Sequence, residues 1–484
     1  MKLYKNEPEF YKRVFKLALP IAFQSLITTG VNMLDNIMVG QLQDEKITAV
    51  AQANVFIGIY HILCMGLGMG ASVLVSRYWG MKNSETGDKE AAGHALKQTV
   101  TLMLRLAMGL AAIFAIITAV APKTIMSIYT DNPVVKEFGA NYFKYSIPTY
   151  FFLGASLVTT IVLRSVGQVK LPMFVSIGAF FVNMGANYTF IFGHFGAPRM
   201  EEQGAALGTL IARIFEATCI MTYFLVVDKK IGFKIKDMFL KTRNLIGEYF
   251  RICIPVLISD GILAIGNSTV ASVIGKLSDQ FAAANSITAT TQQLSTVMIQ
   301  GVCQAGAIVT GQTLGSGGKE KTQEQGWLFL GLGFALGAVS AVILMIICNP
   351  IINSYTGATE EVKSIARDLM TAISFIIIFQ ATNSIMTKGV LRGGGDTKML
   401  MIADNIFLWA LSIPLGYLAG YVFKLDVFWV YFFLKIDQVT KTIWCVIRLR
   451  SGKWIKKIST GKNSNLKMLT ADGEGSTQKA LEAR

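Results

Sequence analysis

The sequence predicts an all-α integral membrane protein of twelve transmembrane helices, arranged as two parallel six-helix repeats, an N-lobe and a C-lobe. Of the 484 residues, 52% are hydrophobic and 15% are charged, whereas soluble domains have about 25% charged residues. Apolar stretches suited to a helix of about 20 residues across a bilayer recur along the chain, and none alternates like a barrel strand. The predicted spans are 15–36, 49–76, 97–121, 140–163, 171–193, 204–227, 248–275, 282–312, 326–349, 366–391, 399–422 and 427–447.

The second half of the chain repeats the first. Pro122 and Arg164 are matched by Pro350 and Arg392, each 228 positions later, and both members of each pair stand in similar local sequences. Duplicated membrane bundles with a site at the repeat interface are a recurrent plan of secondary transporters. We therefore expect function to lie between the two halves.

Lysine and arginine predict the orientation. They concentrate before the first span, between the second and third, and between the sixth and seventh, whereas alternate loops carry acids. Basic loops are cytoplasmic, so both termini are expected in the cytoplasm. The predicted divisions are a cytoplasmic N-terminus at 1–14, the N-lobe at 15–227, a cytoplasmic linker at 228–247, the C-lobe at 248–450, and a disordered cytoplasmic tail at 451–484.

Composition also bears on several classes of function. The net charge of +15 comes from bases in the predicted cytoplasmic loops and tail, which favours anionic lipid headgroups over nucleic acid as the partner. The three histidines and six cysteines have no metal-ligand spacing, and no Ser/His/Asp group or P-loop is apparent. We expect no enzyme activity and no cofactor, and we expect energy from an ion gradient or from downhill flow.

Four polar residues of the predicted N-lobe spans are candidates for binding a cation. A charge at the bilayer centre costs about 2.5 to 3.5 kcal/mol, so an acid kept there generally faces a bundle interior or cavity. Asp35 lies in span 1, Asn183 and Asn187 lie one turn apart in span 5, and Thr209 lies in span 6. A carboxylate with neutral oxygens suits H⁺ or Na⁺. The alternatives are a solvated helix end for Asp35 and interhelical hydrogen bonds for the other three.

The second half contains acids of its own. Asp260 follows Pro255 by five residues in span 7, and it either binds a ligand or stabilises a helix broken at the proline. Asp404, at the start of span 11, has the same two interpretations. Three charged residues of span 12 are expected to neutralise one another: Lys435, Asp437 and Lys441.

Several motifs resemble those of the multidrug and toxic compound extrusion (MATE) transporters over roughly residues 10–455. They are Leu19-Pro20, Leu34-Asp35-Asn36-Ile37-Met38-Val39-Gly40, Gly204-Ala205-Ala206-Leu207-Gly208-Thr209 and Val390-Leu391-Arg392-Gly393-Gly394-Gly395-Asp396-Thr397. The resemblance implies two six-helix lobes that rock around a central cavity and export organic cations in exchange for Na⁺ or H⁺. It also implies a monomer in a bacterial inner membrane.

The resemblance assigns roles to the candidate residues. Asp35 matches the helix 1 acid of the family, Asn183 its helix 5 asparagine and Thr209 its helix 6 threonine, in an N-lobe site for H⁺ or Na⁺. Asn187 stands where some members have a second aspartate, which removes one charge.

The NorM-like branch of the family has further acids in helices 7 and 10. Asp260 lies near the first of these positions, and the second is Asn383, close to Gln380. Asp260, Asn383 and Gln380 are therefore a candidate C-lobe site for substrate or ion.

The predicted function is that of a secondary active antiporter. It exports cationic amphipathic drugs or metabolites in exchange for H⁺ or Na⁺ by alternating access of the two lobes. The predicted partners are small organic cations, a monovalent cation and the bilayer. The alternative is a flippase for a lipid-linked sugar, from the same superfamily. Such flippases tend to have fourteen spans and an Arg-lined cavity, whereas acids and amides predominate inside these spans.

Overall fold

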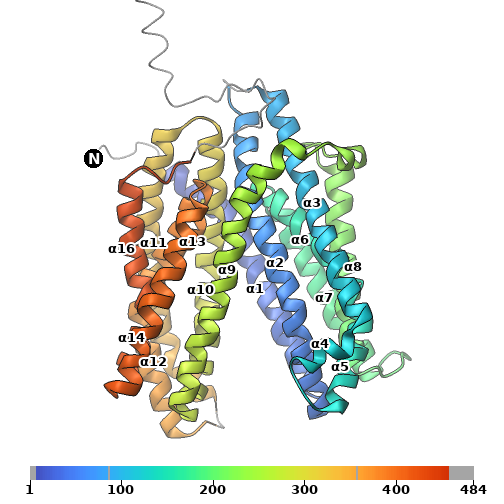
Figure 1. The fold of residues 1–484 in the computed structure, drawn as a ribbon, viewed down its shortest axis with the longest axis vertical. Helices are drawn as coiled ribbons and strands as arrows, with labels where there is room; N and C mark the ends of the chain where they lie inside the picture. Colours follow the sequence, from blue (N-terminus) through green and yellow to red (C-terminus); the bar gives the residue numbers. More distant parts are fainter. Residues whose placement is uncertain (1–6, 86–87, 356–357, 457–484) are drawn as a thin grey trace, which may run out of the picture. The chain divides into compact units, whose positions relative to one another are not determined.

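The computed structural model describes residues 7–85, 88–355 and 358–456, and within these ranges the chain folds into helices and connecting turns without a β-strand (Figure 1). The first half contains α1 (Glu7–Val39), α2 (Asp44–Lys82), α3 (Lys89–Val120), α4 (Pro122–Ser127), α5 (Pro133–Ser146), α6 (Thr149–Ser165), α7 (Lys170–Phe192), α8 (Glu202–Thr222) and its π-helical extension η1 (Tyr223–Val227).

The second half follows a short linker helix, η2 (Ile235–Phe239). It contains α9 (Arg243–Leu277), α10 (Asp279–Gly315), α11 (Lys319–Ser354), α12 (Glu360–Ser384), η3 (Ile385–Leu391), α13 (Thr397–Ile406), η4 (Phe407–Ser412), α14 (Ile413–Tyr417), η5 (Leu418–Val422), α15 (Val427–Leu434) and α16 (Asp437–Arg450).

The length and composition of these helices suit a membrane. Nine helices of the described chain could each cross a bilayer, and two bent pairs bring the number to 11. One pair is α5 and α6, which meet at 53°, and the other is formed by the two parts of α10, bent by 47°. The prediction of an all-α membrane protein is confirmed. Eleven predicted spans coincide with these helices, which mostly extend beyond the apolar cores from which the spans were predicted.

The twelfth predicted span, 427–447, is divided. It consists of α15 and α16, with a turn at Lys435 and Ile436 between them. At the break, the backbone N–H of Asp437 donates to the hydroxyl of Ser412 at 2.8 Å. A side chain thus satisfies a donor that an uninterrupted helix would pair internally.

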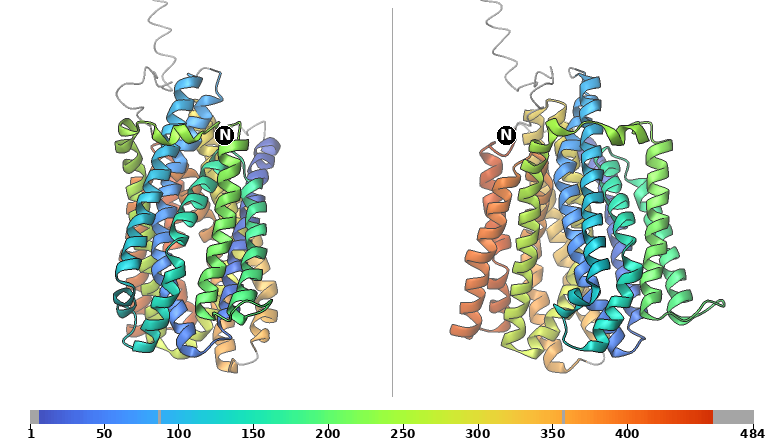
Figure 2. Two further views of the ribbon diagram at one scale, coloured as in Figure 1. Left: turned by 90° about the vertical axis from the view of Figure 1, so that its right-hand side faces the viewer. Right: turned by 45° about the vertical axis from the view of Figure 1, so that its right-hand side comes forward.

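Packing divides the chain into two compact units. Unit 1 comprises the described residues of Met1–Ala22, Ser76–Lys89 and Ile254–Arg484, and unit 2 comprises Phe23–Val75 and Glu90–Cys253. The boundaries of the units cut through α1, α2 and α9 and separate the first residue of α3 from the rest of that helix. Within each unit the long helices run side by side (Figures 1 and 2). In unit 2, the loop between α7 and α8 projects beyond the helices it joins (Figure 2).

The start of the predicted tail is packed in unit 1. The Trp454 side chain is fully buried and its indole N–H donates to Gln323 at 2.8 Å. A Cβ on Gly394 would lie 2.3 Å from the Trp454 ring, so only glycine admits the indole there. The tail predicted to be disordered comprises residues 451–484. Residues 451–456 are described, whereas 457–484 lie outside the described chain.

The predicted linker packs on α3 within unit 2 through Asp237. Its carboxylate accepts from Lys97 Nζ at 2.8 Å and from the backbone N–H of Lys234 at 2.9 Å, and its carbonyl accepts from Thr101 Oγ1 at 2.7 Å. Burial favours the neutral acid, but these bonds and the charges of Lys97 and Lys236 outweigh it, so the pKa of Asp237 lies below its ordinary value.

This contact predicts a pH-dependent contribution to stability. Because the native pKa of Asp237 is depressed, its contribution is present above the unfolded value of about 3.9 and is lost as pH falls through the native pKa. We expect Asp237→Asn to lower the free energy of unfolding by about 1 to 3 kcal/mol at pH 7. Melting temperatures from pH 7 to 3 should show this deficit shrinking. Asp131→Asn, in the exposed α4–α5 loop, should match wild type throughout.

Candidate cation site

The candidate site in unit 2 is built around Asp35, one turn before the end of α1. Its side chain is half-buried, and its Oδ1 accepts a hydrogen bond from Nδ2 of Asn187 at 2.5 Å. No cation lies within ion-pair distance of this carboxylate among the described residues. A membrane-embedded carboxylate with only an amide donor remains available to a mobile cation.

The asparagines of α7 extend this contact into a chain of three side chains. Asn183 and Asn187 are 2% and 1% exposed, and Asn187 Nδ2 also points to Asn183 Oδ1 at 3.3 Å. The remaining amide oxygen, Asn187 Oδ1, is buried and has no hydrogen-bond partner among the described residues. An unpaired buried acceptor is costly, and a bound cation would satisfy it.

Two glycines of α8 bring this helix against α7. A Cβ on Gly204 would lie 2.5 Å from the Phe190 backbone, and a Cβ on Gly208 would lie 2.0 Å from Asn187 Oδ1. Glycines one turn apart allow membrane helices to approach closely. Gly208 thus places the α8 backbone directly against the asparagine that bonds Asp35, a role that residue types alone did not reveal.

The fourth predicted residue, Thr209, is adjacent to Gly208 and half-buried. Within the described chain, its hydroxyl makes no hydrogen bond to Asp35, Asn183 or Asn187. One turn further along α8, Arg213 pairs with Glu216, their Nη1 and Oε2 atoms 2.5 Å apart. Their spacing of three residues in one helix accounts for this ion pair.

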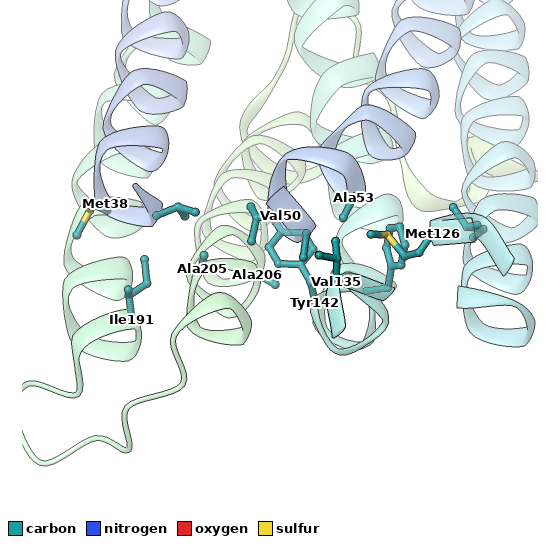
Figure 3. Close-up of a cluster of buried hydrophobic side chains, with 13 residues drawn as sticks. Met38, Val50, Ala53, Met126, Val135, Tyr142, Ile191, Ala205 and Ala206 are labelled. Carbon is teal, nitrogen blue, oxygen red and sulfur yellow. The ribbon is translucent and has the colours of Figure 1, made fainter. Parts of the chain in front are cut away.

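An apolar layer lies one turn from the polar residues, toward the end of α1 (Figure 3). Met38 follows Asp35 by three positions, Ile191 follows Asn187 by four, and Ala205 precedes Thr209 by four. All three belong to one buried cluster that also contains Val50, Ala53, Met126, Val135 and Tyr142. The buried apolar core of unit 2 therefore begins within one turn of the candidate site.

The three candidate residues of the second half have separate partners within unit 1. Asp260 Oδ1 pairs with Arg392 Nη2 at 3.3 Å. Gln380 accepts from Gln292 at 2.6 Å, and Asn383 donates to Gln438 at 2.9 Å. No direct hydrogen bond joins these candidates to one another in the described chain.

The fold brings together three charged residues of the second half that the sequence did not place in one group. Lys441 lies between Asp437 and Asp404, with N–O distances of 3.0 and 3.6 Å. The spacing of Asp437 and Lys441 in one helix predicts their contact, whereas Asp404 comes from α13. That third member could not be assigned from spacing.

These features define a duplicated helical membrane protein with polar groups inside its helices, which is the organisation of a transporter. The MatE family model matches the chain twice, at residues 20–189 and 249–418. The chain therefore belongs to the MatE family of membrane transporters. The two matches also agree with the repeat, because their starts are 229 positions apart.

Curated relatives span nearly the whole chain. A probable multidrug resistance protein NorM from Thermotoga maritima is 24% identical over 93% of this chain and 94% of its own. The corresponding protein from Neisseria meningitidis serogroup B is 23% identical over 91% and 95%.

Solved structures show the same fold. MATE crystal structures described as straight and bent superpose with TM-scores of 0.80 and 0.79 at 18% identity. They cover 91% and 92% of this chain and 96% of their own. The twelve-helix, two-lobe architecture of these transporters agrees with the predicted fold class.

Proposed function

We propose that this transporter exports cationic amphipathic molecules in exchange for a monovalent cation, H⁺ or Na⁺, that binds at Asp35. The contact of Asp35 with the buried Asn187 is the observation that carries the proposal. It provides one acidic group, a neutral amide and an unpaired amide oxygen within a membrane helix pair. The multidrug resistance names of the NorM relatives support small-molecule export.

Coupling requires only that substrate and cation favour opposite states of the protein. In its ion-free form, Asp35 is charged and favours a state that accepts cationic cargo. Binding of the external cation neutralises Asp35, changes its contact with Asn187 and favours the state that releases the cargo. Substrate and cation then compete through one conformational equilibrium without touching each other.

The membrane potential can contribute to this cycle. One net positive charge that moves inward across 100 mV contributes about 2.3 kcal/mol. Antiport of one monocationic cargo against one monovalent cation transfers no net charge, so this contribution requires an additional coupling ion or a neutral cargo. The dependence of transport on the imposed potential therefore reports the stoichiometry.

Transport in reconstituted vesicles tests the proposal. Ethidium efflux is measured under an imposed Na⁺ gradient at equal pH and, separately, under an imposed pH gradient without Na⁺. Acceleration by one gradient identifies the coupling ion. No acceleration with either gradient, together with translocation of a fluorescent lipid-linked sugar, would reject drug antiport and support the flippase alternative.

Gly208 provides a test that changes no polar group of the site. In Gly208→Ala, the new methyl group must displace Asn187 Oδ1 from a position 2.0 Å away, and thus disturb the Asn187–Asp35 contact. We expect gradient-driven ethidium efflux to fall at least tenfold, with a stability loss of about 1 to 3 kcal/mol from the added volume.

Gly185→Ala is the matched control. Gly185 also lies in the α7–α8 hairpin, but a Cβ there would meet no atom within 4 Å. This variant should transport like wild type. Equal transport by Gly208→Ala and Gly185→Ala would show that the Asn187 position is unimportant for coupling.

A further inference from the structure

Three charged side chains meet in the interior of unit 1. Asp404 of α13 and Asp437 of α16 both face the ammonium of Lys441, and the three side chains are 7%, 2% and 4% exposed. Both carboxylates share this one ammonium as their ion-pair partner among the described residues, and Lys435 interacts with Asp437 only at longer range. A carboxylate that is incompletely neutralised at such depth is unfavourable, so a further cation would stabilise this group.

No other base forms an ion pair with these two carboxylates in the described chain. Asp260 of α9 is paired with Arg392, and Cys445 on α16 is a buried thiol, which offers no positive charge. Lys435, in the turn before α16, and the exposed Lys388 of η3 are the remaining bases. Within the described chain, neither comes within 4.0 Å of the Asp404 or Asp437 carboxylate.

The two carboxylates are held very differently. Asp437 accepts from Ser412 Oγ at 3.0 Å, from Gln438 Nε2 at 2.7 Å and from Lys441 at 3.0 Å. Asp404 has the Ser259 hydroxyl at 3.3 Å and Lys441 at 3.6 Å. Shorter contacts to ionised groups are the stronger ones. Asp437 is therefore the fixed counter-ion of Lys441, and Asp404 is the carboxylate that can exchange partners.

An unpaired oxygen marks the same network. Asn383 is 5% exposed and donates to Gln438, which in turn donates to Asp437. The oxygen of the same amide, Asn383 Oδ1, is buried and finds no hydrogen-bond partner in the part of the chain that the structure describes. Carboxylate and amide oxygens are the ligands that hard cations prefer.

We propose that Asp404 forms a second site for an exchangeable monovalent cation, in which the incoming H⁺ or Na⁺ competes with the ammonium of Lys441. When the cation binds, Lys441 keeps its shorter contact with Asp437 and releases Asp404. The charge of the group then becomes zero. This site is separate from Asp35 and does not depend on the proposed export function.

The test measures cation binding by purified protein in detergent, without any transport substrate. Melting is followed by tryptophan fluorescence while NaCl replaces N-methyl-D-glucamine chloride at constant ionic strength, and in a second series while pH is lowered without Na⁺. A bound cation raises the melting temperature by mass action. The Asp35→Asn background removes the other candidate site.

In this background we expect a saturable rise with Na⁺ or with acid, and we expect Asp404→Asn to abolish it. A response to NaCl at constant pH identifies Na⁺, and a response to acid alone identifies H⁺. If Asp35→Asn by itself removes every cation response, or if adding Asp404→Asn leaves the response unchanged, the second site is rejected.

Lys441→Gln tests the competition itself and keeps the proposal testable even if Asp404→Asn misfolds. Removing the internal competitor should lower the half-saturating cation concentration at least tenfold. Lys435→Gln is the control, because Lys435 makes no ion pair with either carboxylate in the described chain. This variant should keep the half-saturating cation concentration within twofold of its value before the substitution. An unchanged half-saturation in Lys441→Gln would overturn the proposed competition.

Discussion

We expect Asp35→Asn to abolish gradient-driven ethidium exchange and to leave a folded protein. The substitution keeps the shape of the side chain and its contact region with Asn187 but removes the negative charge of Asp35, the acid of the candidate site in unit 2. Without that charge, H⁺ or Na⁺ has no carboxylate to neutralise in α1. The cation gradient therefore can no longer drive efflux through this site. We expect the gradient-dependent part of efflux to fall at least a hundredfold in reconstituted vesicles.

The matched control is Asp131→Asn, which removes an exposed acid from the loop between α4 and α5. Its efflux should equal that of wild type. Gel filtration and melting temperature establish folding for both variants. Normal exchange by well-folded Asp35→Asn protein would remove Asp35 from the coupling mechanism.

We expect Lys441→Met to destabilise the protein strongly. It leaves Asp404 and Asp437 buried without their shared ammonium, and breaking a buried ion pair in this way typically costs about 3 to 5 kcal/mol. The free energy of unfolding in mixed micelles, measured by titration with SDS in the absence of Na⁺, should fall by that amount.

A second substitution identifies electrostatics as the cause. Asp404→Asn in the Lys441→Met protein removes one of the two stranded charges, so it should restore part of the lost stability. Lys435→Met should cost less than about 1 kcal/mol, since Lys435 forms no ion pair with either acid in the described chain. Additive effects of Lys441→Met and Asp404→Asn would show that the two charges do not interact.

The fold was predictable because bilayer physics imposes long apolar helices on the sequence. Eleven of the predicted spans coincide with single helices or bent pairs, and the repeat offset of 228 agrees with the twofold match of the family model. The break between α15 and α16 was not predictable from hydropathy, since it depends on Ser412, a residue of η4, replacing a backbone partner for Asp437.

The candidate site was predictable only in part. Asp35 stood out as an acid inside an apolar span, and the spacing of Asn183 and Asn187 placed them on one face. The direct contact of Asn187 with Asp35 depends on how closely α8 lets the helices pack. The close approach of α8 is possible because Gly204 and Gly208 have no side chain, and for the same reason these residues do not stand out as binding residues in the sequence.

The charged group around Lys441 was missed for a related reason. Asp437 and Lys441 are neighbours on one helix, and their mutual neutralisation is a sufficient explanation at the level of sequence. Asp404 joins them only through tertiary packing. The sequence grouped Lys435 with Asp437 and Lys441, whereas in the fold Lys441 faces both Asp404 and Asp437, and Lys435 forms no ion pair with either acid in the described chain.

Reversal of the ion gradient tests antiport most directly. Vesicles that contain the reconstituted protein are prepared with the coupling cation concentrated on either side, and ethidium movement is followed in both. Exchange at Asp35 predicts that ethidium moves against the cation in each case, that its direction reverses with the gradient, and that Asp35→Asn shows neither movement. Ethidium flux that follows its own concentration alone, whichever way the cation gradient points, would contradict the coupled exchange proposed for this protein.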